Sequence, residues 1–389
     1  MGKCMIRLLK VFHWPLARLS FFIPKKASVV VFGSWFGRSY RDNPRYVFEY
    51  MSVHSSDSKC VWLTKNRAVL RHVRSLGHLA HYAYSPLGYY YSIRASMAVI
   101  CVSEADVNRF IVPPLVVNLW HGVTIKKLYA DRRPLTDGRE TPTWRSRVNA
   151  MLAPRYTQFF LAASSLEARR MASAFQTPVN QIFVSGYPRT DSISVQAPRD
   201  PLRSLLYMPT FRRTAGFSPE QFLVDSEKEV SAFLNTHSVE LLYKPHVHAA
   251  RGRKGRSAPS IEGPIRFVAE GPLVEPTDLL WQSDILITDY SSIMFDFLLT
   301  GKPIIFAPFD LENYVKDEGG FYSDYESFVP GPLCKDWSEV LHWVTLFREN
   351  PNLYSEERKR VLEVSYEFPR GNSSKTVSDQ MKKILRNQL

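Results

Sequence analysis

Cysteine is scarce in this chain and never occurs in a spacing that binds metal. The 389 residues include four cysteines, which are scattered and form no Cys-x-x-Cys pair: Cys4, Cys60, Cys101 and Cys334. So few and so widely separated cysteines are typical of a protein of the reducing cytoplasm. The sequence therefore predicts a cytoplasmic protein, and its cysteines argue against a structural zinc site.

Long apolar runs are missing as well, even near the N-terminus. Residues 3 to 26 mix apolar and aromatic side chains with Lys3, Arg7, Lys10, Arg18, Lys25 and Lys26. These charges interrupt every apolar run well before the roughly 20 residues that a membrane-spanning helix needs. No small-residue cleavage site follows, which argues against a secretory signal. A basic amphipathic segment with Trp and Phe is typical of the membrane interface. We expect residues 1–26 to attach to a membrane surface; the alternative is a terminal helix packed on its own domain.

Negative charge is the scarcer sign. The 37 Asp and Glu are outnumbered by 50 Lys and Arg, which gives a formal net charge of +13. This balance favours an anionic partner, which could be nucleic acid, anionic lipid or a phosphorylated substrate. No recognisable nucleic-acid-binding motif accompanies the charge. We therefore expect a phosphorylated substrate and a membrane surface, and no nucleic acid.

Repeats and low-complexity tracts are also absent, and short apolar runs alternate with helical stretches instead. This alternation predicts parallel sheets covered by helices on both faces. A break at Gly186-Tyr187-Pro188, continued by Pro198 and Pro201, predicts a linker. The simplest architecture is α/β, with two doubly wound, Rossmann-like domains facing a cleft. We place these domains at residues 27–190 and 200–370 and a C-terminal helix at 371–389.

The boundaries of the expected elements follow from the same pattern. The strands should cover residues 29–32, 60–63, 97–102, 116–119, 159–162, 182–184, 205–208, 239–243, 265–268, 285–287 and 304–307. The main helices should cover residues 164–175, 219–234, 277–282, 291–300 and 338–348. Ligands of such sheets bind beyond the carboxyl ends of the strands.

One of these strand ends carries the richest polar cluster of the chain. Thr288, Asp289 and Tyr290 lead into Ser291 and Ser292 at the start of an expected helix. A helix N-terminus offers unpaired N–H groups and the positive end of a dipole. The two serines can cap that helix and donate to phosphate oxygens. We expect a nucleotide diphosphate here; an ordinary capped helix in a parallel sheet is the alternative.

A second strand end carries a candidate base. The run Asn118-Leu-Trp-His-Gly122 continues straight out of a strand, where Gly122 permits a tight turn beside His121. Imidazole is the usual general base near neutral pH. We predict that His121 is catalytic, against the alternative of a structural histidine. Lys126, at the start of the next helical region, is a candidate phosphate ligand.

Two further strand ends carry basic residues. Arg212 and Arg213 follow one strand, and Lys244 and His246 follow the next. All four side chains suit phosphate oxygens. His246 and His248 could suggest a metal, but no carboxylate lies at a suitable spacing, so we predict no metal ligand.

Acidic residues complete the candidate site. Asp289 beside an anion would be repelled unless it meets a hydroxyl, a cation or a nearby arginine. Asp296 lies five positions after Ser291 and is less suited to the same phosphate. Glu318 belongs to a later acidic and glycine-containing segment, where it could orient substrate hydroxyls or simply be solvated.

Taken together, these motifs resemble the CDP-glycerol glycerophosphotransferases of teichoic-acid and capsule synthesis. The matching segments are residues 118–122 with 126–128, 186–191, 207–212, 244–246, 284–292 with 295–296, and 324–325 with 330–333. The likeness covers residues 27 to 345, and the order and number of the motifs make it strong.

The resemblance implies a GT-B architecture in which the C-terminal domain holds most of CDP-glycerol. It also implies that an acceptor hydroxyl attacks the β-phosphorus and that CMP leaves. The family places the base at His121 and the donor site at Arg212, His246, Asp289, Ser291 and Ser292. We therefore predict His121 and Asp289 as catalytic. The predicted substrate-binding residues are Gly122, Lys126, Arg212, Arg213, Lys244, His246, Thr288, Tyr290, Ser291, Ser292, Asp296 and Glu318.

The chain departs from the family at a few positions, which bear on donor and acceptor details. Val123 and Thr124 stand where Thr-Pro is more usual, and Val247 stands where proline often follows the histidine. Polymerising members tend to carry an extra N-terminal region, while priming members are near this length. We therefore expect an enzyme that adds one or a few glycerol phosphates to a membrane-linked saccharide or polyol phosphate.

The expected partners are CDP-glycerol, a lipid-linked glycan acceptor and the inner face of the cell membrane. No cofactor is certain, and Mg²⁺ is the one candidate. Four alternatives stay open at this point. They are a GT-B glycosyltransferase that uses a nucleotide sugar, a ribitol-phosphate transferase, a glycerol-phosphate polymerase, and a non-catalytic membrane or nucleic-acid binder.

Overall fold

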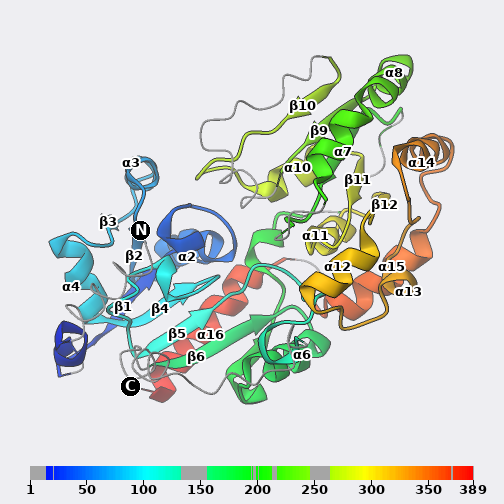
Figure 1. Cartoon of the computed structure of the whole chain (residues 1–389). Helices are drawn as coiled ribbons and strands as arrows, with labels where there is room; N and C mark the ends of the chain where they lie inside the picture. The colour runs from blue at the N-terminus through cyan, green and yellow to red at the C-terminus, as the bar shows by residue number, and fades with distance from the viewer. Residues whose placement is uncertain are drawn as a thin grey trace.

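The chain folds into two α/β domains, each built on a parallel sheet (Figure 1). The computed structural model describes residues 15–20, 22–132, 156–193, 195, 199, 201–212, 217–245, 263–368 and 371–388. Two Rossmann-like domains that face each other across a cleft are the predicted architecture, and the observed one confirms it.

Seven parallel strands form the sheet of the N-terminal domain, in the order β3-β2-β1-β4-β5-β6-β7. They are β1 (Lys26–Phe32), β2 (Lys59–Thr64), β3 (Ala80–Tyr82), β4 (Ala95–Ile100), β5 (Leu115–Asn118), β6 (Thr157–Ala162) and β7 (Ile182–Val184). The order reverses between β1 and β4, which creates the switch point where doubly wound sheets bind ligands. The segments after β1, β4 and β5 therefore converge at one edge of the sheet.

Five parallel strands form the sheet of the C-terminal domain, in the order β10-β9-β8-β11-β12. They are β8 (Ser204–Met208), β9 (Glu240–Tyr243), β10 (Ile265–Phe267), β11 (Ile285–Thr288) and β12 (Ile304–Phe306). Here the order reverses between β8 and β11. This switch point brings together the segments that follow β8, β9 and β11, which contain most of the predicted site.

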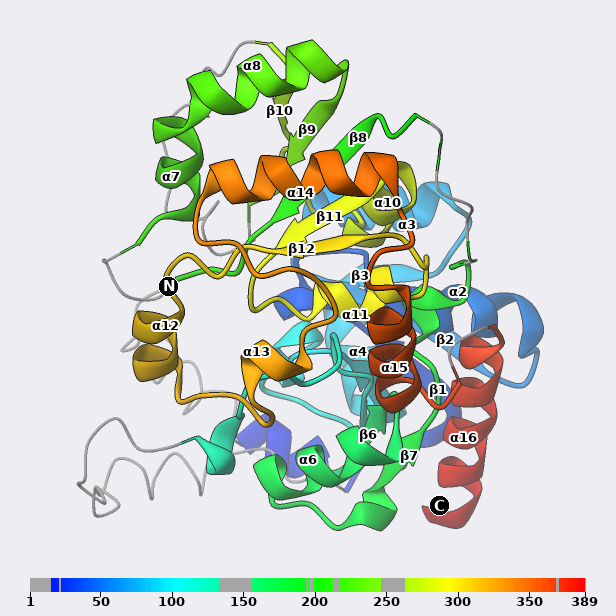
Figure 2. The same ribbon diagram turned by 90° about the vertical axis from the view of Figure 1, so that its right-hand side faces the viewer.

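Helices cover both faces of each sheet, as Figures 1 and 2 show. The N-terminal domain has α2 (Asn43–His54), α3 (Arg67–Ser75), α4 (Pro86–Arg94) and α6 (Ser165–Phe175). The rest of the chain has α7 (Pro219–Asp225), α8 (Glu227–His237), α10 (Pro276–Gln282), α11 (Ile293–Leu298), α12 (Leu311–Glu318), α13 (Tyr325–Phe328), α14 (Trp337–Glu349), α15 (Ser355–Ser365) and α16 (Ser373–Gln388).

The core follows the two-residue period of the strands. Along β1, Val30 and Phe32 pack with helix α2, while Val29 and Val31 pack in a second cluster that includes Tyr91 of α4. The cluster on the α2 side continues into the C-terminal domain, where it takes in residues of β8, β11 and α11. One apolar core therefore joins the two domains.

The last helix returns to the N-terminal domain, where α16 lies against α2 (Figure 1). Asp191 holds its N-terminus, because its carboxylate accepts hydrogen bonds from the backbone N–H groups of Ser373 and Ser374 at 2.8 Å each. A Cβ on Gly186 would lie 2.4 Å from the hydroxyl oxygen of Ser373. The turn after β7 thus leads the chain towards the second domain and also binds the N-terminus of α16.

Most sequence-predicted strands occur within a few residues of their expected bounds, but three local details differ. The short edge strand β3 was not predicted. The helix expected over residues 219–234 is broken at Ser226, between α7 and α8. The helix expected over 291–300 is only the six-residue α11. None of the helices in the described part of the chain is long and apolar enough to cross a membrane.

Candidate active site

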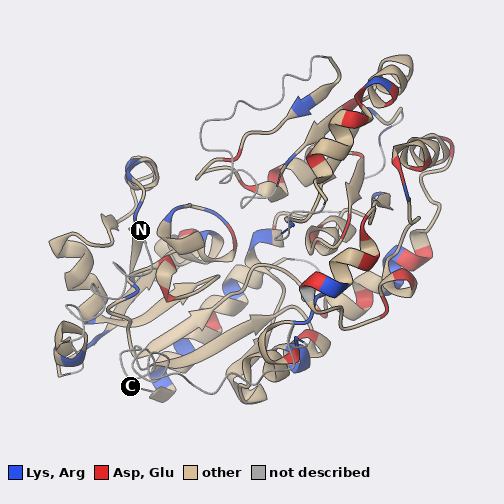
Figure 3. Ribbon diagram, viewed as in Figure 1, with Lys and Arg blue, Asp and Glu red and all other residues tan. Residues whose placement is uncertain are grey.

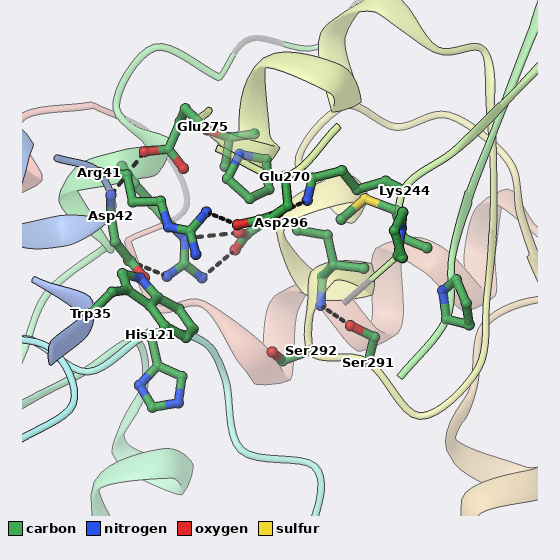
Figure 4. Close-up of a pocket in the computed structure, with 17 residues that line it drawn as sticks. Trp35, Arg41, Asp42, His121, Lys244, Glu270, Glu275, Ser291, Ser292 and Asp296 are labelled. Atoms are coloured by element: carbon green, nitrogen blue, oxygen red, sulfur yellow. Dashed lines mark hydrogen bonds and ion pairs between the residues drawn. The ribbon is translucent and has the colours of Figure 1, made fainter. Parts of the chain in front are cut away.

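Two pockets lie between the domains and meet at His121. Their empty spaces, open solvent at the mouths included, are about 730 Å³ and about 1190 Å³. Trp35, His121, Ser291 and Ser292 line both of them. The first pocket is built largely on the strand ends of the C-terminal domain (Figure 4), and the second largely on the loop that follows β5. His121 thus stands at the junction of two spaces.

His121 is held in the tautomer that a general base needs. Its Nδ1 lies 2.8 Å from the carbonyl oxygen of Cys101. A carbonyl can only accept, so Nδ1 carries the proton and Nε2 of the neutral ring is the acceptor. The ring packs against Trp35 and Trp120, at centroid distances of 5.6 and 4.2 Å. Burial lowers the pKa of His121 from its usual 6.5, although Asp42 acts in the opposite direction. The imidazole is therefore neutral at pH 7.

The backbone on either side of His121 is in a left-handed conformation. Trp120 has a φ of 53° and Gly122 a φ of 147°. Such a conformation at a non-glycine residue costs roughly 1–3 kcal/mol and persists only where the surroundings impose it. The side-chain amide of Asn43 imposes it here, since it donates to the carbonyl oxygens of Leu119 and Trp120 at 3.0 and 3.1 Å.

Gly122 lies close to the C-terminal domain at the start of α11. A Cβ at this position would lie 2.6 Å from the hydroxyl oxygen of Ser292 and 3.4 Å from Nη2 of Arg189. The first distance is shorter than real Cβ contacts, so only glycine allows the His121 turn to lie against Ser292.

Arg189 joins the two domains through a buried ion network. Its Nη1 donates to Asp42 at 2.7 Å, and its Nε and Nη2 donate to the two oxygens of Asp296 at 2.9 and 3.1 Å. The Tyr366 hydroxyl also donates to Asp296, at 2.9 Å. Burial would lower the pKa of Arg189, but Asp296 and Asp42 raise it well above its usual value. Asp296 lines the first pocket with both oxygens engaged, and its predicted contact with substrate stays a prediction.

A second ion network crosses the first pocket. Glu270, in the loop after β10, accepts from Nη1 of Arg41 at 2.6 Å and also pairs with the ammonium group of Lys244 (Figure 4). Arg41 comes from the N-terminal domain and Lys244 from the end of β9. Lys244 therefore lies in the pocket, where a carboxylate of the same chain already holds it, and its contact with substrate stays a prediction.

Ser291 and Ser292 line both pockets, and their contact with a phosphate stays a prediction, but the helix behind them differs from the expected one. Ser292 is the N-cap residue of α11, and its side chain makes no capping hydrogen bond. The hydroxyl of Ser291 accepts from the backbone N–H of Ile293 at 3.4 Å. The expectation that Ser292 caps this helix with its hydroxyl is wrong, and a six-residue helix contributes only a short dipole.

Arg212 and Asp289 form a buried cluster behind the pockets. Arg212 donates to both oxygens of Asp310 at 2.7 Å, and its Nη1 lies 2.9 Å from Oδ2 of Asp289. The Tyr290 hydroxyl donates to Asp310 at 3.1 Å, and Asp289 also accepts from the backbone N–H of Thr210 at 2.8 Å. Burial alone would lower the pKa of Arg212, but Asp289 and Asp310 raise it. This cluster ties the end of β8 to the end of β11, and donor contacts by its members stay predictions.

The remaining predicted residues divide into three groups. The hydroxyl of Thr288 donates to the carbonyl oxygen of Met208 at 2.8 Å, within the sheet. Lys126 lines the second pocket with Gly122 and donates to the Tyr314 hydroxyl at 2.6 Å. Glu318 ends α12, and its side chain lies outside what the structure describes, as do Arg213 and His246.

Sequence reasoning missed several residues that build the site: Trp35, Arg41, Asp42, Arg189, Glu270 and Glu275. Trp35, Arg41 and Asp42 follow β1, whose carboxyl end lies at the same edge of the sheet as that of β5. The rule that ligands bind beyond strand ends therefore applies to these three residues as well. Arg189 lies in the segment 186–191 that was recognised as a motif but assigned only to a linker. Across the described residues, no group of three or more His, Cys, Asp or Glu is arranged to hold a metal ion.

Comparisons with known proteins identify the family of this chain. A family model described as CDP-Glycerol:Poly(glycerophosphate) glycerophosphotransferase matches residues 16–383. The chain belongs to this family. It is a transferase of the CDP-glycerol glycerophosphotransferase type.

Similar proteins of known name include two from bacterial teichoic-acid synthesis. A teichoic acid poly(glycerol phosphate) polymerase of Bacillus spizizenii is 24% identical over 92% of this chain and 93% of its own. A teichoic acid glycerol-phosphate transferase of Staphylococcus aureus is 24% identical over 86% of this chain and 88% of its own. A solved structure of the wall teichoic acid polymerase TagF has a TM-score of 0.74 at 21% identity, over 100% of this chain and 96% of that chain. This likeness confirms the GT-B fold.

Replacing Gly122 with alanine should abolish most of the transferase activity. The added Cβ would push the His121 turn away from Ser292, and a displacement of about 1 Å in an active site can cost on the order of 100-fold in rate. Gly77→Ala is the matched control, because Gly77 also has a positive φ, 81°, but nothing lies within 4 Å of its added Cβ. The measurement is the rate of CMP formation by both variants, with circular dichroism to check folding. Equal rates for the two variants would contradict the close approach.

Proposed function

We propose that this enzyme transfers glycerol phosphate from CDP-glycerol to a hydroxyl of a membrane-linked saccharide or polyol-phosphate acceptor and releases CMP. The observation that carries the proposal is that a neutral histidine stands at the junction of two pockets. A transferase has to hold a donor and an acceptor on either side of its base.

The first pocket suits the donor. It is lined by Lys244, Ser291 and Ser292 at the switch point of the C-terminal sheet, where doubly wound domains bind nucleotides. An ammonium group and hydroxyl donors are the groups that bind phosphate oxygens. One TagF structure with the same fold comes from a crystal soaked with CDPG, which supports a CDP-alcohol as the ligand of this family.

The second pocket suits the acceptor. Its lining combines aromatic side chains, among them Trp120 and Tyr314, with the basic residues Lys126, Lys127 and Arg132. Aromatic faces pack against sugar rings, and basic groups attract phosphates. The surrounding domain is basic as well: residues 15–132 hold 16 Lys and Arg against 6 Asp and Glu, whereas acidic residues mark α7 and α8 (Figure 3).

The proposed chemical step is a displacement at phosphorus. The oxygen of an acceptor hydroxyl attacks the β-phosphorus of CDP-glycerol while the bond from that phosphorus to the CMP oxygen breaks. The hydroxyl proton passes to Nε2 of His121, and CMP leaves with the electron pair of the broken bond. Most of the catalysis in such a transfer is positioning and stabilisation of negative charge, which Lys244 and the donors around Ser291 would supply.

Membrane attachment by the N-terminal segment is part of the proposal. The described part of residues 1–26 includes the helical residues 15–20, and three of its large apolar side chains are exposed, Leu16 by 38%, Leu19 by 60% and Phe22 by 86%. Next to them stand Lys25 and Lys26. Exposed apolar side chains beside basic ones favour insertion into an anionic lipid surface.

We favour one or a few additions per acceptor, although chain length alone does not decide between priming and polymerising. The Bacillus spizizenii polymerase is matched over 93% of its length, so a polymerase of about this size exists in the family. A ribitol-phosphate primase of the same organism is 26% identical over 88% of this chain. Ribitol phosphate is therefore the alternative group that the donor assay has to include.

The central prediction is CMP release that depends on CDP-glycerol. Purified protein incubated with CDP-glycerol and a bacterial membrane extract should release CMP and extend a lipid-linked glycan by one or a few glycerol phosphates, as mass spectrometry of the lipid fraction would show. Parallel assays with CDP-ribitol and with nucleotide sugars compare the donors. Adding EDTA tests whether the donor is used as a magnesium complex.

Each alternative has its own outcome in this assay. A long ladder of products would make the enzyme a polymerase, and faster turnover of CDP-ribitol would change the donor. Activity with a nucleotide sugar and none with CDP-glycerol would refute the proposal. His121→Ala is the catalytic control and should lose about 100- to 10,000-fold in rate.

The pH dependence of the rate should report the neutral state of His121. A general base works only when it is unprotonated, so kcat/KM should fall as the pH drops through the pKa of His121. Because burial lowers that pKa from 6.5, the acidic limb of the profile should lie below pH 6.5 and the rate should be level near neutrality. A profile of kcat/KM against pH, measured with CDP-glycerol, tests this. An acidic limb above pH 7 would contradict it.

Removing residues 1–26 should shift the protein from membranes to solution. Flotation with vesicles that contain anionic lipid should recover the full chain in the lipid fraction and the shortened chain in the soluble fraction. The replacement of Leu19 and Phe22 by serine, which keeps every charge, should weaken binding in the same direction. Unchanged flotation of the shortened chain would refute membrane attachment through this segment.

A further inference from the structure

The loop after β10 clasps a segment of the N-terminal domain at the side of the first pocket. The backbone N–H of Tyr40 donates to the carbonyl oxygen of Pro272 at 2.9 Å, and the backbone N–H of Asp42 donates to Glu275 at 2.8 Å. Between these two contacts, Arg41 is directed to Glu270 (Figure 4). The clasp therefore brings an arginine of one domain into the donor pocket of the other.

Arg41 is buried, yet its hydrogen bonding is incomplete. The residue is 3% exposed, and its guanidinium lies 4.8 Å from the centroid of the Trp35 ring. Nη1 donates to Glu270, but Nε has no partner among the described residues. A buried donor without a partner costs stability unless a ligand satisfies it. Arg41 thus lines the first pocket with a guanidinium whose hydrogen bonds the described residues do not fully satisfy.

Glu270 stands between two cations that come from different domains. One of its carboxylate oxygens accepts from Arg41 and the other pairs with Lys244. Carboxylate and phosphate oxygens are both negatively charged hydrogen-bond acceptors, and an arginine guanidinium can bind either group through two parallel hydrogen bonds. The position of the Glu270 carboxylate, between Arg41 and Lys244, could therefore also hold a phosphate group.

We propose that Arg41 is a donor-binding residue supplied by the N-terminal domain, and that Glu270 holds its place and that of Lys244 until the diphosphate of the donor replaces it. The inference rests on the proposed function, because it takes the first pocket as the donor site. Donor binding is then an exchange of anions: Glu270 leaves Arg41 and Lys244, and phosphate oxygens take both cations. Glu270 therefore competes with the substrate for these two cations. The exchange also breaks the Arg41–Glu270 ion pair, which is one of the contacts between the loop after β10 and the N-terminal domain.

Calorimetric titration with CDP, which carries a diphosphate, and with CMP, which does not, tests the inference without any turnover. Arg41→Met keeps the length of the side chain and removes its charge. It should weaken CDP binding by about tenfold and CMP binding much less. Glu270→Gln removes the competitor and should tighten CDP binding several-fold. Arg41→Lys keeps the charge but loses the planar set of guanidinium donors, so its affinity for CDP should lie between that of the unaltered protein and that of Arg41→Met.

Glu275→Gln is the matched control, because Glu275 belongs to the same clasp and the same pocket. It accepts from the backbone N–H of Asp42, and no ion pair joins it to Arg41 or Lys244 among the described residues, although the charge of Arg41 lowers its pKa. Burial and the nearby Asp42 raise the pKa of Glu275 to about 7, so the titrations should be done at a pH well above that value, where Glu275 is charged. Glu275→Gln should not tighten CDP binding. Equal tightening by both glutamine variants would show that loosening of the clasp, and not competition, is the cause, and would overturn the proposal.

Two further outcomes separate this inference from the proposed function. If the unaltered protein binds CDP and CDP-glycerol but Arg41→Met and Arg41→Lys bind them equally well, the role of Arg41 is refuted while the donor site stands. If the unaltered protein binds neither ligand, the donor assignment fails and this inference fails with it.

Discussion

The geometry of the site depends on one buried guanidinium. Arg189 leaves the turn after β7 and binds Asp42 of the N-terminal domain and Asp296 of the C-terminal domain at the same time. Buried ion pairs add little net stability, because the cost of removing charges from water offsets their attraction. Their geometry, however, is restrictive, since a buried charge that loses its partner is strongly destabilising. Arg189 therefore fixes how the two domains sit against each other.

The same network reaches the chemistry through two routes. The first is position: Asn43, next to Asp42, accepts from the backbone of Arg189 and donates to the strained turn before His121. The second is charge, because Asp42 raises the pKa of His121 while Arg189 lowers it. With these two influences opposed, burial decides the outcome and keeps the imidazole neutral. The network that joins the domains thus also sets the position and the charge state of the His121 ring.

The sequence predicted the parts of the site that depend on strand ends, and missed the parts that depend on pairing across the fold. His121, Lys244 and the two serines lie where parallel strands end, and an apolar run followed by polar residues is a local pattern. The partners Arg189 and Asp296 are 107 residues apart, so no spacing links them. Arg212 was predicted to bind phosphate and Arg189 was noted only within the matched segment 186–191, yet each is bound by two carboxylates of the same chain. Residue type alone cannot tell such an arginine from one that binds phosphate.

Local structure was hardest to predict where tertiary contacts override it. The strand β3, Ala-His-Tyr, lies at the sheet edge and lacks the isoleucine that marks each of the equally short strands β7, β10 and β12. The helix after the two serines ends early, although its sequence allows more turns. The break at Ser226 separates α7 and α8 within a stretch whose apolar residues favour a single helix.

The two interdomain ion networks differ in a way that suits their positions. Around Arg189, three side-chain nitrogens of one arginine are matched by oxygens of two carboxylates, and Tyr366 adds a further donor to Asp296. Around Glu270, a single carboxylate is shared by two cations, and one nitrogen of Arg41 has no partner among the described residues. A saturated network resists change, whereas an undersaturated one can exchange its anion for another at lower cost. The first network lies beside His121, and the second lines the first pocket, which we propose binds the charged donor. A transferase that binds and releases an anion at every turnover needs both kinds of contact between the same two domains.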